Sequence, residues 1–491
     1  MLTRIVLAFA LLFIAPLARA QDPAQIDPGA LAARHGFQPH DLGIVLFDPA
    51  SGRVLLEHRG DAPFIPASTE KVPTALAALD TLGAGFRFAT TLHAAGPVYD
   101  GVLKGDLVLR GGGDPQLDTN ALRTLVKSLT GAGITRIEGA FLIDDSLFPS
   151  AAEIDPQQLA AAPYNPAVSA LSVNFNRVEL RWRRDARDPQ RVDATVLSPA
   201  AGGELPITAV GAAPLDGPPD PRLAFVFAGT PSPRWLLSPS LPPHGRVFLP
   251  VKTAPAMVTA ELFSIVARRA GIALPAAQPG TVPAGAREIG RVESPPLAAV
   301  IKKMLDYSNN LTAELVGLAT SHTLTGQGLT LSASAERLTQ WWQEQLPTVS
   351  FKGFVAANHS GLSTTTRTTP RQLASILRYG LAAPAGILPA LLKAHDPDGA
   401  VANPRVRAKS GTMHYADGLV GLLRAPDGQE RGFVILLTDR HKRSELDTAR
   451  DLRVNEPPPG ARAWTARAKA LERELLRYWT TGTTVAAARA R

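Results

Sequence analysis

The chain of 491 residues contains no cysteine. Disulfide bonds and thiolate metal sites are therefore excluded, and packing and hydrogen bonds alone must hold the fold together. The sequence also lacks the H-E-x-x-H pattern of zinc peptidases, and its ten histidines are scattered along the chain. We therefore expect no metal site and no cofactor.

Long apolar runs are missing everywhere except at the N-terminus. There, Arg4 precedes an apolar run from Ile5 to Leu17, and a small-residue cleavage site of the A-x-A type ends at Ala20. The run is about 13 residues long, short of the roughly 20 that span a bilayer. The pattern predicts a signal peptide over residues 1–20, a mature chain that begins near Gln21, a periplasmic location and no integral membrane span.

Charge is not extreme, because Asp, Glu, Lys and Arg make up 19% of the chain and the hydrophobic residues 45%. This is the composition of an ordinary globular protein. The formal net charge is +8, but an exported chain does not meet nucleic acid, so we expect no nucleic-acid partner. The length exceeds what one hydrophobic core usually covers, which indicates two or more domains or one domain with a large insertion.

A serine and a lysine lie three residues apart where an apolar helical pattern begins. Residues 42–59 read as two strands joined by a turn, and the segment PASTEKVPTALAAL follows with Ser68 and Lys71. Residues three apart share one helix face, so the hydroxyl and the amine lie within reach of each other. A serine becomes a nucleophile when a base takes its proton, and a lysine can be that base once its pKa is lowered. An N-cap serine followed by a solvated lysine would give the same pattern. Pro73 follows past the expected first turn, so we predict a local distortion there.

Two further short motifs occur later in the chain. Ser308-Asn309-Asn310 falls at the break between two helical patterns, where polar residues are normally caps. Lys409-Ser410-Gly411-Thr412 lies on a strand that precedes a predicted β-hairpin about Asp427-Gly428, and a final amphipathic helix is predicted from about Ala461 to Trp479. Each tripeptide alone carries little information. In this order, after the first motif and in an exported chain, they form a specific set.

The three motifs together resemble the active site of the penicillin-recognising serine enzymes, whose motifs are S-x-x-K, S-D-N and K-T-G. Here the second motif has asparagine in the middle and the third has serine for threonine. Ser308 follows Lys71 by 237 positions, too far for the helical subdomain of a plain β-lactamase. The chain is therefore similar to the D-alanyl-D-alanine carboxypeptidase/endopeptidase family, the class C low-molecular-mass penicillin-binding proteins. The segments KGDLVLRGGGDPQL, GAFLIDDSLF and YNPAVSALSVNFNRVEL also resemble that family.

The resemblance implies an α+β fold. We expect a serine β-lactamase/transpeptidase-like domain, an antiparallel sheet flanked by helices, formed by residues 21–85 plus 250–491. A large, mainly β insertion of one or more modules, residues 86–249, is expected between the first and second motifs.

The resemblance also assigns roles to the motif residues. Lys71, as a neutral amine, would take the proton of Ser68 while the hydroxyl attacks the carbonyl of a D-alanyl-D-alanine peptide. Ser308 would relay a proton to the leaving amine, and Asn310 would hydrogen-bond the substrate backbone and Lys71. Lys409 would attract the terminal carboxylate and lower the pKa of Lys71.

The third motif would complete the site. By family likeness, the backbone N–H groups of Ser68 and Thr412 would bind the oxyanion, with Gly411 between the hydroxyl-bearing residues. Ser410 and Thr412 would offer hydroxyls to the substrate carboxylate.

The inserted part and the residue two beyond Thr412 would contact the stem peptide. Asp144 would bind an amino group, Phe148 would form an apolar wall, and His414 would replace a polar amide that relatives often carry. The alternative is that Asp144 caps a turn and Phe148 belongs to the core.

The implied function is a serine carboxypeptidase or endopeptidase that acts on peptidoglycan stem peptides and is inhibited covalently by β-lactams. An esterase or β-lactamase of the same superfamily is an alternative, although the sequence lacks the E-x-x-L-N stretch of class A β-lactamases. A non-catalytic envelope-binding protein with the same fold is another. The oligomeric state is left open.

Overall fold

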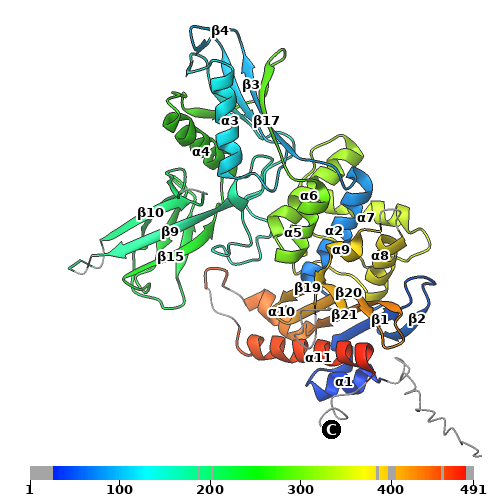
Figure 1. The fold of residues 1–491 in the computed structure, drawn as a ribbon. Coiled ribbons are helices and arrows are strands. Elements are labelled where there is room, and N and C mark those ends of the chain that lie inside the picture. The colour runs from blue at the N-terminus through cyan, green and yellow to red at the C-terminus, as the bar shows by residue number, and fades with distance from the viewer. Residues whose placement is uncertain are drawn as a thin grey trace, which may run out of the picture.

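The structure is a computed structural model of the chain (Figure 1). It describes residues 26–482 except 186, 189–190, 201–202, 383–385, 396–404, 450 and 455–457. The predicted signal peptide and the predicted start of the mature chain lie outside the described residues.

The centre of the part that carries the three motifs is a six-stranded antiparallel sheet with the order β18-β19-β20-β21-β1-β2. Its strands are β1 (Leu42–Phe47), β2 (Val54–His58), β18 (Lys393–Ala394), β19 (Val406–Met413), β20 (Ala416–Arg424) and β21 (Glu430–Thr438). The first two confirm the strand pair expected over residues 42–59, and β20 and β21 form the expected hairpin about Asp427-Gly428. The mixed α+β fold class is confirmed.

Helices cover both faces of this sheet, which is why β1 is buried at every position and reads as an uninterrupted apolar run. The first face carries α1 (Pro28–Arg34) and α11 (Ala461–Thr481), and α11 agrees with the predicted final helix. The second face carries α2 (Lys71–Leu82), α5 (Leu297–Tyr307), α6 (Asn310–Thr325), α7 (Leu331–Gln345), α8 (Pro370–Ala382) and α9 (Leu388–Leu391), while α10 (Arg440–Ala449) follows β21. In the part of the chain that the structure describes, no helix is both long and apolar enough to cross a bilayer.

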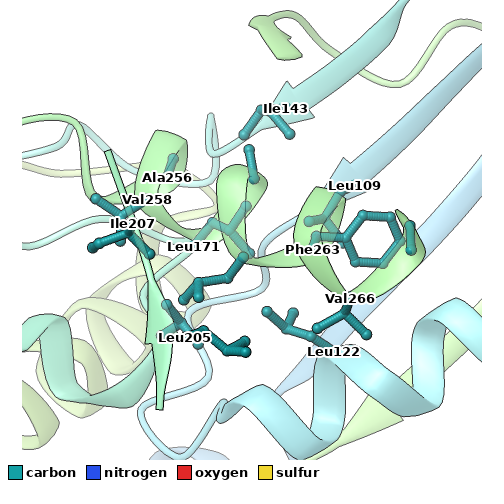
Figure 2. Close-up of a cluster of buried hydrophobic side chains, with 14 of the residues drawn as sticks. Leu109, Leu122, Ile143, Leu171, Leu205, Ile207, Ala256, Val258, Phe263 and Val266 are labelled. Carbon is teal, nitrogen blue, oxygen red and sulfur yellow. The ribbon is translucent and has the colours of Figure 1, made fainter. Parts of the chain in front are cut away.

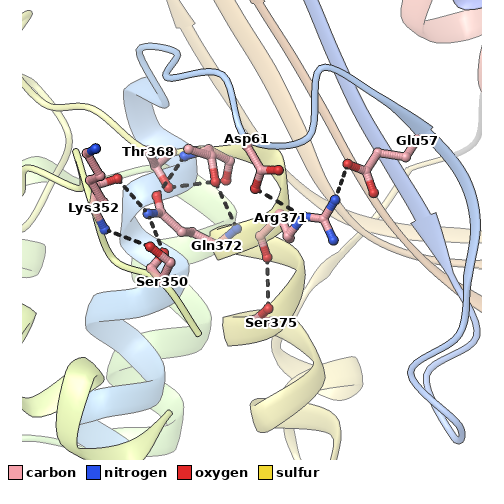
Figure 3. Close-up of polar contacts among 9 residues, drawn as sticks. Glu57, Asp61, Ser350, Lys352, Thr368, Arg371, Gln372 and Ser375 are labelled. Atoms are coloured by element: carbon pink, nitrogen blue, oxygen red, sulfur yellow. Dashed lines mark hydrogen bonds and ion pairs between the residues drawn. The ribbon is translucent and has the colours of Figure 1, made fainter. Parts of the chain in front are cut away.

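Polar contacts fasten the start of α8 to the sheet edge and to a neighbouring loop (Figure 3). The Arg371 guanidinium pairs with Glu57 at the end of β2, at 2.5 Å, and with Asp61 at 3.1 Å. Gln372 donates to the carbonyl of Ser350 at 2.9 Å. These contacts fix α8 against the sheet that carries the third motif.

The inserted part contains a second sheet with the order β16-β8-β6-β3-β17, packed against two helices. The elements are β3 (Ala89–Ala95), β6 (Asp106–Arg110), β8 (Phe141–Asp144), β16 (Ala277–Pro279), β17 (Arg287–Glu293), α3 (Thr119–Gly131) and α4 (Pro255–Arg269). A small sheet of β4 (Val98–Tyr99), β5 (Val102–Leu103) and β7 (Arg136–Ile137) lies beside them.

Two further small sheets form a lobe that extends away from the rest of the molecule in Figure 1. One has the order β11-β10-β9-β15, and the other has the order β12-β14-β13. Their strands are β9 (Arg177–Arg184), β10 (Val192–Ser198), β11 (Leu205–Pro206), β12 (Gly211–Pro214), β13 (Phe225–Ala228), β14 (Arg234–Leu237) and β15 (His244–Pro250).

The end of the insertion lies later than the sequence suggests. Residues 250–293, which we expected in the transpeptidase-like domain, contain β17, and β17 pairs with β3 of the inserted sheet. Phe263 and Val266 of α4 lie in the same hydrophobic cluster as Leu109 and Leu122 of the inserted part (Figure 2). Because strand pairing and core packing both join this segment to the insertion, we propose that the inserted part runs from residue 86 to about 293.

The distortion expected at Pro73 is not present. A 3-10 turn, Ala67–Glu70, precedes α2, so the α-helix begins at Lys71 and Pro73 is its third residue. The N–H groups of the first helical turn have no intrahelical partner, so a proline there costs no hydrogen bond.

Candidate active site

The first motif lies in the 3-10 turn that leads into α2. Ala67 has a left-handed backbone with φ of 47°, which is uncommon for a residue that carries a side chain. The turn brings the Ser68 hydroxyl to 3.0 Å from the Lys71 amine. The proximity expected from their spacing is present.

Three oxygen atoms surround the amine of Lys71, whose side chain is completely buried. Nζ lies 2.7 Å from Oδ1 of Asn310, 2.7 Å from the carbonyl oxygen of Ser360 and 3.0 Å from Oγ of Ser68. The amide of Asn310 also donates from Nδ2 to the carbonyl oxygen of Tyr164 at 2.9 Å. This second bond sets the amide orientation, because only the oxygen of Asn310 can then face Lys71.

Burial lowers the pKa of Lys71 well below its ordinary value of 10.5, and the positive charge of Lys409 lowers it further. Glu314 and Glu70 oppose this shift. Burial also raises the pKa of Glu70 to about 8, so this carboxyl is mostly protonated at neutral pH and opposes only weakly. The surroundings therefore favour the neutral amine.

The second motif separates α5 from α6, as the break in the helical pattern predicts. Ser308 ends α5 in a left-handed conformation with φ of 55°. The side chain of Asn309 caps α6 by accepting from the N–H of Thr312 at 2.9 Å. Asn310 is consequently the first residue of α6, and this position brings its amide to Lys71.

The third motif lies on β19 and brings a second lysine to the site. Lys409 is 3% exposed, and its Nζ lies 3.0 Å from Oγ of Ser308. Burial lowers the pKa of Lys409 to about 8, with smaller contributions from the positive charges of Lys469 and Lys393. Two lysines thus contact two serines around one cleft.

Gly411 allows β19 to approach the turn that carries Ser68. A Cβ atom at this position would lie 2.6 Å from the carbonyl oxygen of Pro66, 2.7 Å from N of Ser68 and 2.8 Å from N of Thr69. All three are backbone atoms that cannot rotate away, so the approach requires glycine. It brings β19, which also carries Thr412, close to the backbone of the 3-10 turn that contains Ser68.

Thr412 and Ser410 differ from expectation. The Thr412 hydroxyl donates to Oδ1 of Asp417 at 2.7 Å, so it presents only lone pairs to the cleft, where we expected a donor to the carboxylate. Asp417 is held by Lys469, whose Nζ lies 2.9 Å from Oδ2. Ser410 is exposed and is not among the residues that line the cleft.

The cleft beside Ser68 has a volume of about 560 Å³. It is lined by Ala67, Ser68, Gln158, Tyr164, Ser308, Asn310, Gly361, Leu362, Thr412, Met413, His414, Arg443, Ala461, Arg462 and Thr465. The lining combines hydroxyl, amide, guanidinium and imidazole groups with apolar side chains such as those of Leu362 and Met413. In the described ranges no aspartate or glutamate is part of this lining.

His414 lines the cleft, but the two residues predicted from the insertion do not. Asp144 is 3% exposed and accepts from the backbone and hydroxyl of Ser146, so it caps a turn. Phe148 is 2% exposed and packs in a hydrophobic cluster with Val168 and Leu315. The structure therefore agrees with the turn-cap and core alternatives for these residues.

Residues from other elements, which were not predicted from the sequence, also reach the cleft. Gln158 and Tyr164 come from the inserted part, Arg443 from α10, and Arg462 and Thr465 from α11. None of them belongs to a motif. The segment that contains Tyr164 resembles the family, and that resemblance was the one available signal.

Glu314, inside α6, was also missed. Its carboxylate accepts from the backbone N–H groups of His359 at 3.0 Å and Ser360 at 2.9 Å. These bonds hold the loop whose Ser360 carbonyl contacts Lys71. A buried glutamate in the middle of a helix has no sequence signature that would predict this position.

Comparison with solved structures relates the whole arrangement to known folds. Penicillin-binding protein 4 from Haemophilus influenzae superposes with a TM-score of 0.73 at 21% identity, covering 92% of this chain and 98% of that chain. A complex of the same protein with a β-lactam gives a TM-score of 0.70 at 19% identity, covering 89% and 96%. The transpeptidase-like fold with its insertion is therefore shared.

Relatives of known activity also match the sequence. A D-alanyl-D-alanine carboxypeptidase from an Actinomadura species is 27% identical over 423 residues, which span 79% of this chain and 76% of that protein. The D-alanyl-D-alanine carboxypeptidase of H. influenzae is 34% identical over 110 residues, 22% of this chain and 23% of that protein. Residues 30–455 match the D-Ala-D-Ala carboxypeptidase 3 (S13) family, and with the serine and lysine geometry described above this places the chain in that family of serine peptidases.

Proposed function

We propose that this chain is a periplasmic serine D-alanyl-D-alanine carboxypeptidase, D,D-endopeptidase or both, which acts on peptidoglycan stem peptides through an acyl-enzyme on Ser68. Membership in the family supports the reaction class. The predicted signal peptide supports the location. The geometry around Lys71 supports the mechanism and carries the proposal.

The hydrogen-bond inventory of Lys71 favours its role as the base. A neutral amine has two N–H donors and one lone pair. Oδ1 of Asn310 and the carbonyl oxygen of Ser360 can only accept, and each lies 2.7 Å from Nζ. Both donors are therefore used there, and the lone pair is left for the hydroxyl of Ser68 at 3.0 Å. This arrangement is ready to remove the proton of the nucleophile.

Acylation follows from this arrangement. Oγ of Ser68 attacks the carbonyl carbon between the two D-alanines while its proton moves to Nζ of Lys71. The backbone N–H groups of Ser68 and Thr412 bind the resulting oxyanion, an interaction worth roughly 3 to 4 kcal/mol per donor in comparable sites. Gly411 allows the backbone of β19 to lie close to the backbone of Ser68, and this supports a shared role for the two N–H groups.

Ser308 and Lys409 complete the first half of the reaction. Lys409, with a pKa of about 8, is mostly protonated at neutral pH and donates to Oγ of Ser308. The hydroxyl of Ser308 passes its proton to the leaving amine as the C–N bond breaks, and the Lys71 ammonium returns the proton that it took from Ser68 to Oγ of Ser308, so both groups regain their starting state. The charge of Lys409 also attracts the carboxylate of the terminal D-alanine. Water then hydrolyses the ester and restores Ser68.

Deacylation of a bound β-lactam should be slow. The described residues that line the cleft include no carboxylate that could activate water, unlike an efficient β-lactamase. The H. influenzae relative has been solved with a bound β-lactam, which supports β-lactams as ligands of this fold. We therefore expect penicillin to inhibit the enzyme and not to be hydrolysed efficiently by it.

Labelling with a fluorescent penicillin tests the proposal. The wild-type chain should become covalently labelled, and Ser68→Ala should remove all label while its melting temperature stays nearly unchanged. Thr69→Ser, one residue away, is the matched control and should label normally. Label retained in Ser68→Ala would place the nucleophile elsewhere. Incubation with purified muropeptides and mass analysis would then separate carboxypeptidase from endopeptidase products.

A further inference from the structure

A second cavity, of about 370 Å³, adjoins the active-site cleft. It is lined by Pro63, Phe64, Ile65, Arg367, Thr438, Arg440, Arg443, Ser444, Asp447 and Thr448. The residues come from the segment before the Ser68 turn, the loop before α8, the end of β21 and helix α10. Arg443 also lines the active-site cleft, so its side chain forms a common wall between the two cavities.

The cavity holds more positive than negative charge. Three arginines line it, but Asp447 is its one carboxylate. Both oxygens of Asp447 are bonded to Arg443, one of them at 3.1 Å from Nε. The carboxylate and Arg443 therefore neutralise each other, and Arg367 and Arg440 remain uncompensated.

Neither of these two arginines has an ion-pair partner among the described residues. Arg367 donates from Nη1 to the carbonyl oxygens of Thr364 and Thr366, the latter at 2.9 Å. Arg440 donates to the carbonyl oxygen of Pro63, and its guanidinium lies 6.0 Å from the centre of the Phe64 ring. A guanidinium has five N–H donors, so each retains donors that these contacts do not use.

The positive charges of Arg367 and Arg440 repel each other. Burial lowers the pKa of Arg367 and the positive charge of Arg440 lowers it further, whereas Asp447 and Arg443 act in opposite directions. A guanidinium keeps its proton at any working pH, so the repulsion cannot be relieved by deprotonation. An anion that enters the cavity would relieve it and would find a fork of donors suited to oxyanions.

We propose that this cavity, which we call the arginine pocket, is a second binding site that takes a phosphate or carboxylate group. Arg367 and Arg440 bind the anion, and the hydroxyl of Ser444, which lines the same cavity, is available as a further donor. The site does not depend on the proposed reaction. Two sources share this chemistry: the carboxylates of peptidoglycan stem peptides and the phosphates of anionic lipids or envelope polymers.

Titration with inorganic phosphate at constant ionic strength tests the site in the full chain. Calorimetry should show saturable binding, and phosphate should raise the melting temperature by mass action. Arg440→Gln, at an exposed position, should weaken phosphate binding by about tenfold or more, the usual effect of losing a charge-assisted contact. Arg367→Gln should do the same and serves as the second variant if either one fails to fold.

Arg378→Gln is the matched control. Arg378 is also exposed and also donates to a backbone carbonyl, that of Ser51, but lies outside the pocket. Its removal lowers the net charge equally and should leave phosphate binding within about twofold of wild type. If phosphate binding weakened equally in all three variants, net charge alone would explain the effect, and the proposal would be overturned. Absence of saturable binding in the wild type would overturn it as well.

Competition identifies the source. A disaccharide muropeptide that displaces phosphate from wild type, but has no such effect in Arg440→Gln, assigns the pocket to the stem peptide. Binding to vesicles of phosphatidylglycerol that is lost in the same variant assigns it to lipid phosphate. Fluorescent penicillin should label Arg440→Gln normally. Failure of labelling in wild type would contradict the proposed function without affecting the phosphate result.

Discussion

Replacing Asn310 by aspartate places a negative charge against the proposed base. Oδ1 of Asn310 lies 2.7 Å from Nζ of Lys71, and an aspartate in the same rotamer would put a carboxylate oxygen there. At an effective dielectric constant of about 20, Coulomb's law gives roughly 6 kcal/mol for unit charges at that distance, or about four pKa units. This value is an upper limit. Asn310 donates from Nδ2 to the carbonyl oxygen of Tyr164, and an aspartate would have an oxygen there instead, which disfavours its charged form.

The sign of the effect is clear. A nearby anion favours the protonated amine, so the pKa of Lys71 rises in Asn310→Asp and the neutral base is populated only at higher pH. The acidic limb of the pH profile for penicillin acylation should move upward by about two to four units. At pH 7 the rate constant should fall about tenfold for each unit by which the new pKa of Lys71 exceeds 7, and it should recover as the pH increases.

Asn309→Asp is the matched control. It adds the same charge one residue away, where the side chain caps α6 and an aspartate caps equally well. Its acylation profile should stay close to that of wild type. An unshifted profile in Asn310→Asp, with a uniform loss at every pH, would show that Asn310 acts by binding substrate and that Lys71 need not be neutral.

Three more predictions follow from the same geometry. Lys71→Arg should lose penicillin acylation by several orders of magnitude at every accessible pH, because guanidinium cannot release its proton, and near-normal labelling would exclude Lys71 as the base. Gly411→Ala should slow acylation strongly by pushing β19 away from Ser68 N, whereas Gly131→Ala, where a Cβ meets nothing within 4 Å, should not. Glu70→Gln should raise the free energy of unfolding measured in urea. Burial raises the pKa of Glu70 from 4.5 to about 8, so the folded wild type loses stability as the pH rises through that range. The difference in free energy of unfolding between variant and wild type should grow from about pH 5 to pH 8 and reach on the order of 3 kcal/mol at pH 7. A difference that does not depend on pH would contradict this prediction.

The three motifs could be predicted because each lies at a position that the sequence marks. Lys71 begins an apolar helix, Ser308 falls at a break between two helical patterns, and Lys409 lies in a strand before a hairpin. The contact between Lys71 and Asn310 joins residues from distant segments, and the resemblance supplied it. Helix and strand periodicity alone would not have done so.

The boundary of the insertion could not be read in the same way. Strand β17 is polar and only partly buried, since it lies at the edge of its sheet, so its sequence lacks the alternation that marks a strand. Its partner β3 lies far earlier in the chain. The apolar pattern of α4 predicts a helix correctly but does not indicate which core receives it.

Single residues that reach the cleft were the hardest to predict. Tyr164 and Arg443 come from a loop and a helix end that only the tertiary fold brings together. Asp144, in contrast, was expected to bind an amino group because its segment resembles the family. The nearby Ser146 was a signal for a turn, since aspartate commonly accepts hydrogen bonds from the residue two positions later.

The pairing of β1 with β21 has a consequence for how the chain folds. Leu42 lies opposite Leu437, so the inner edge of β1 stays unpaired until nearly the whole chain has been made. The intervening insertion has its own core and can fold during that time. An exposed apolar strand edge is a site of aggregation, and contacts between distant residues slow folding. In refolding from denaturant, the insertion should therefore fold first. Most of the aggregation should occur before β1 has paired with β21.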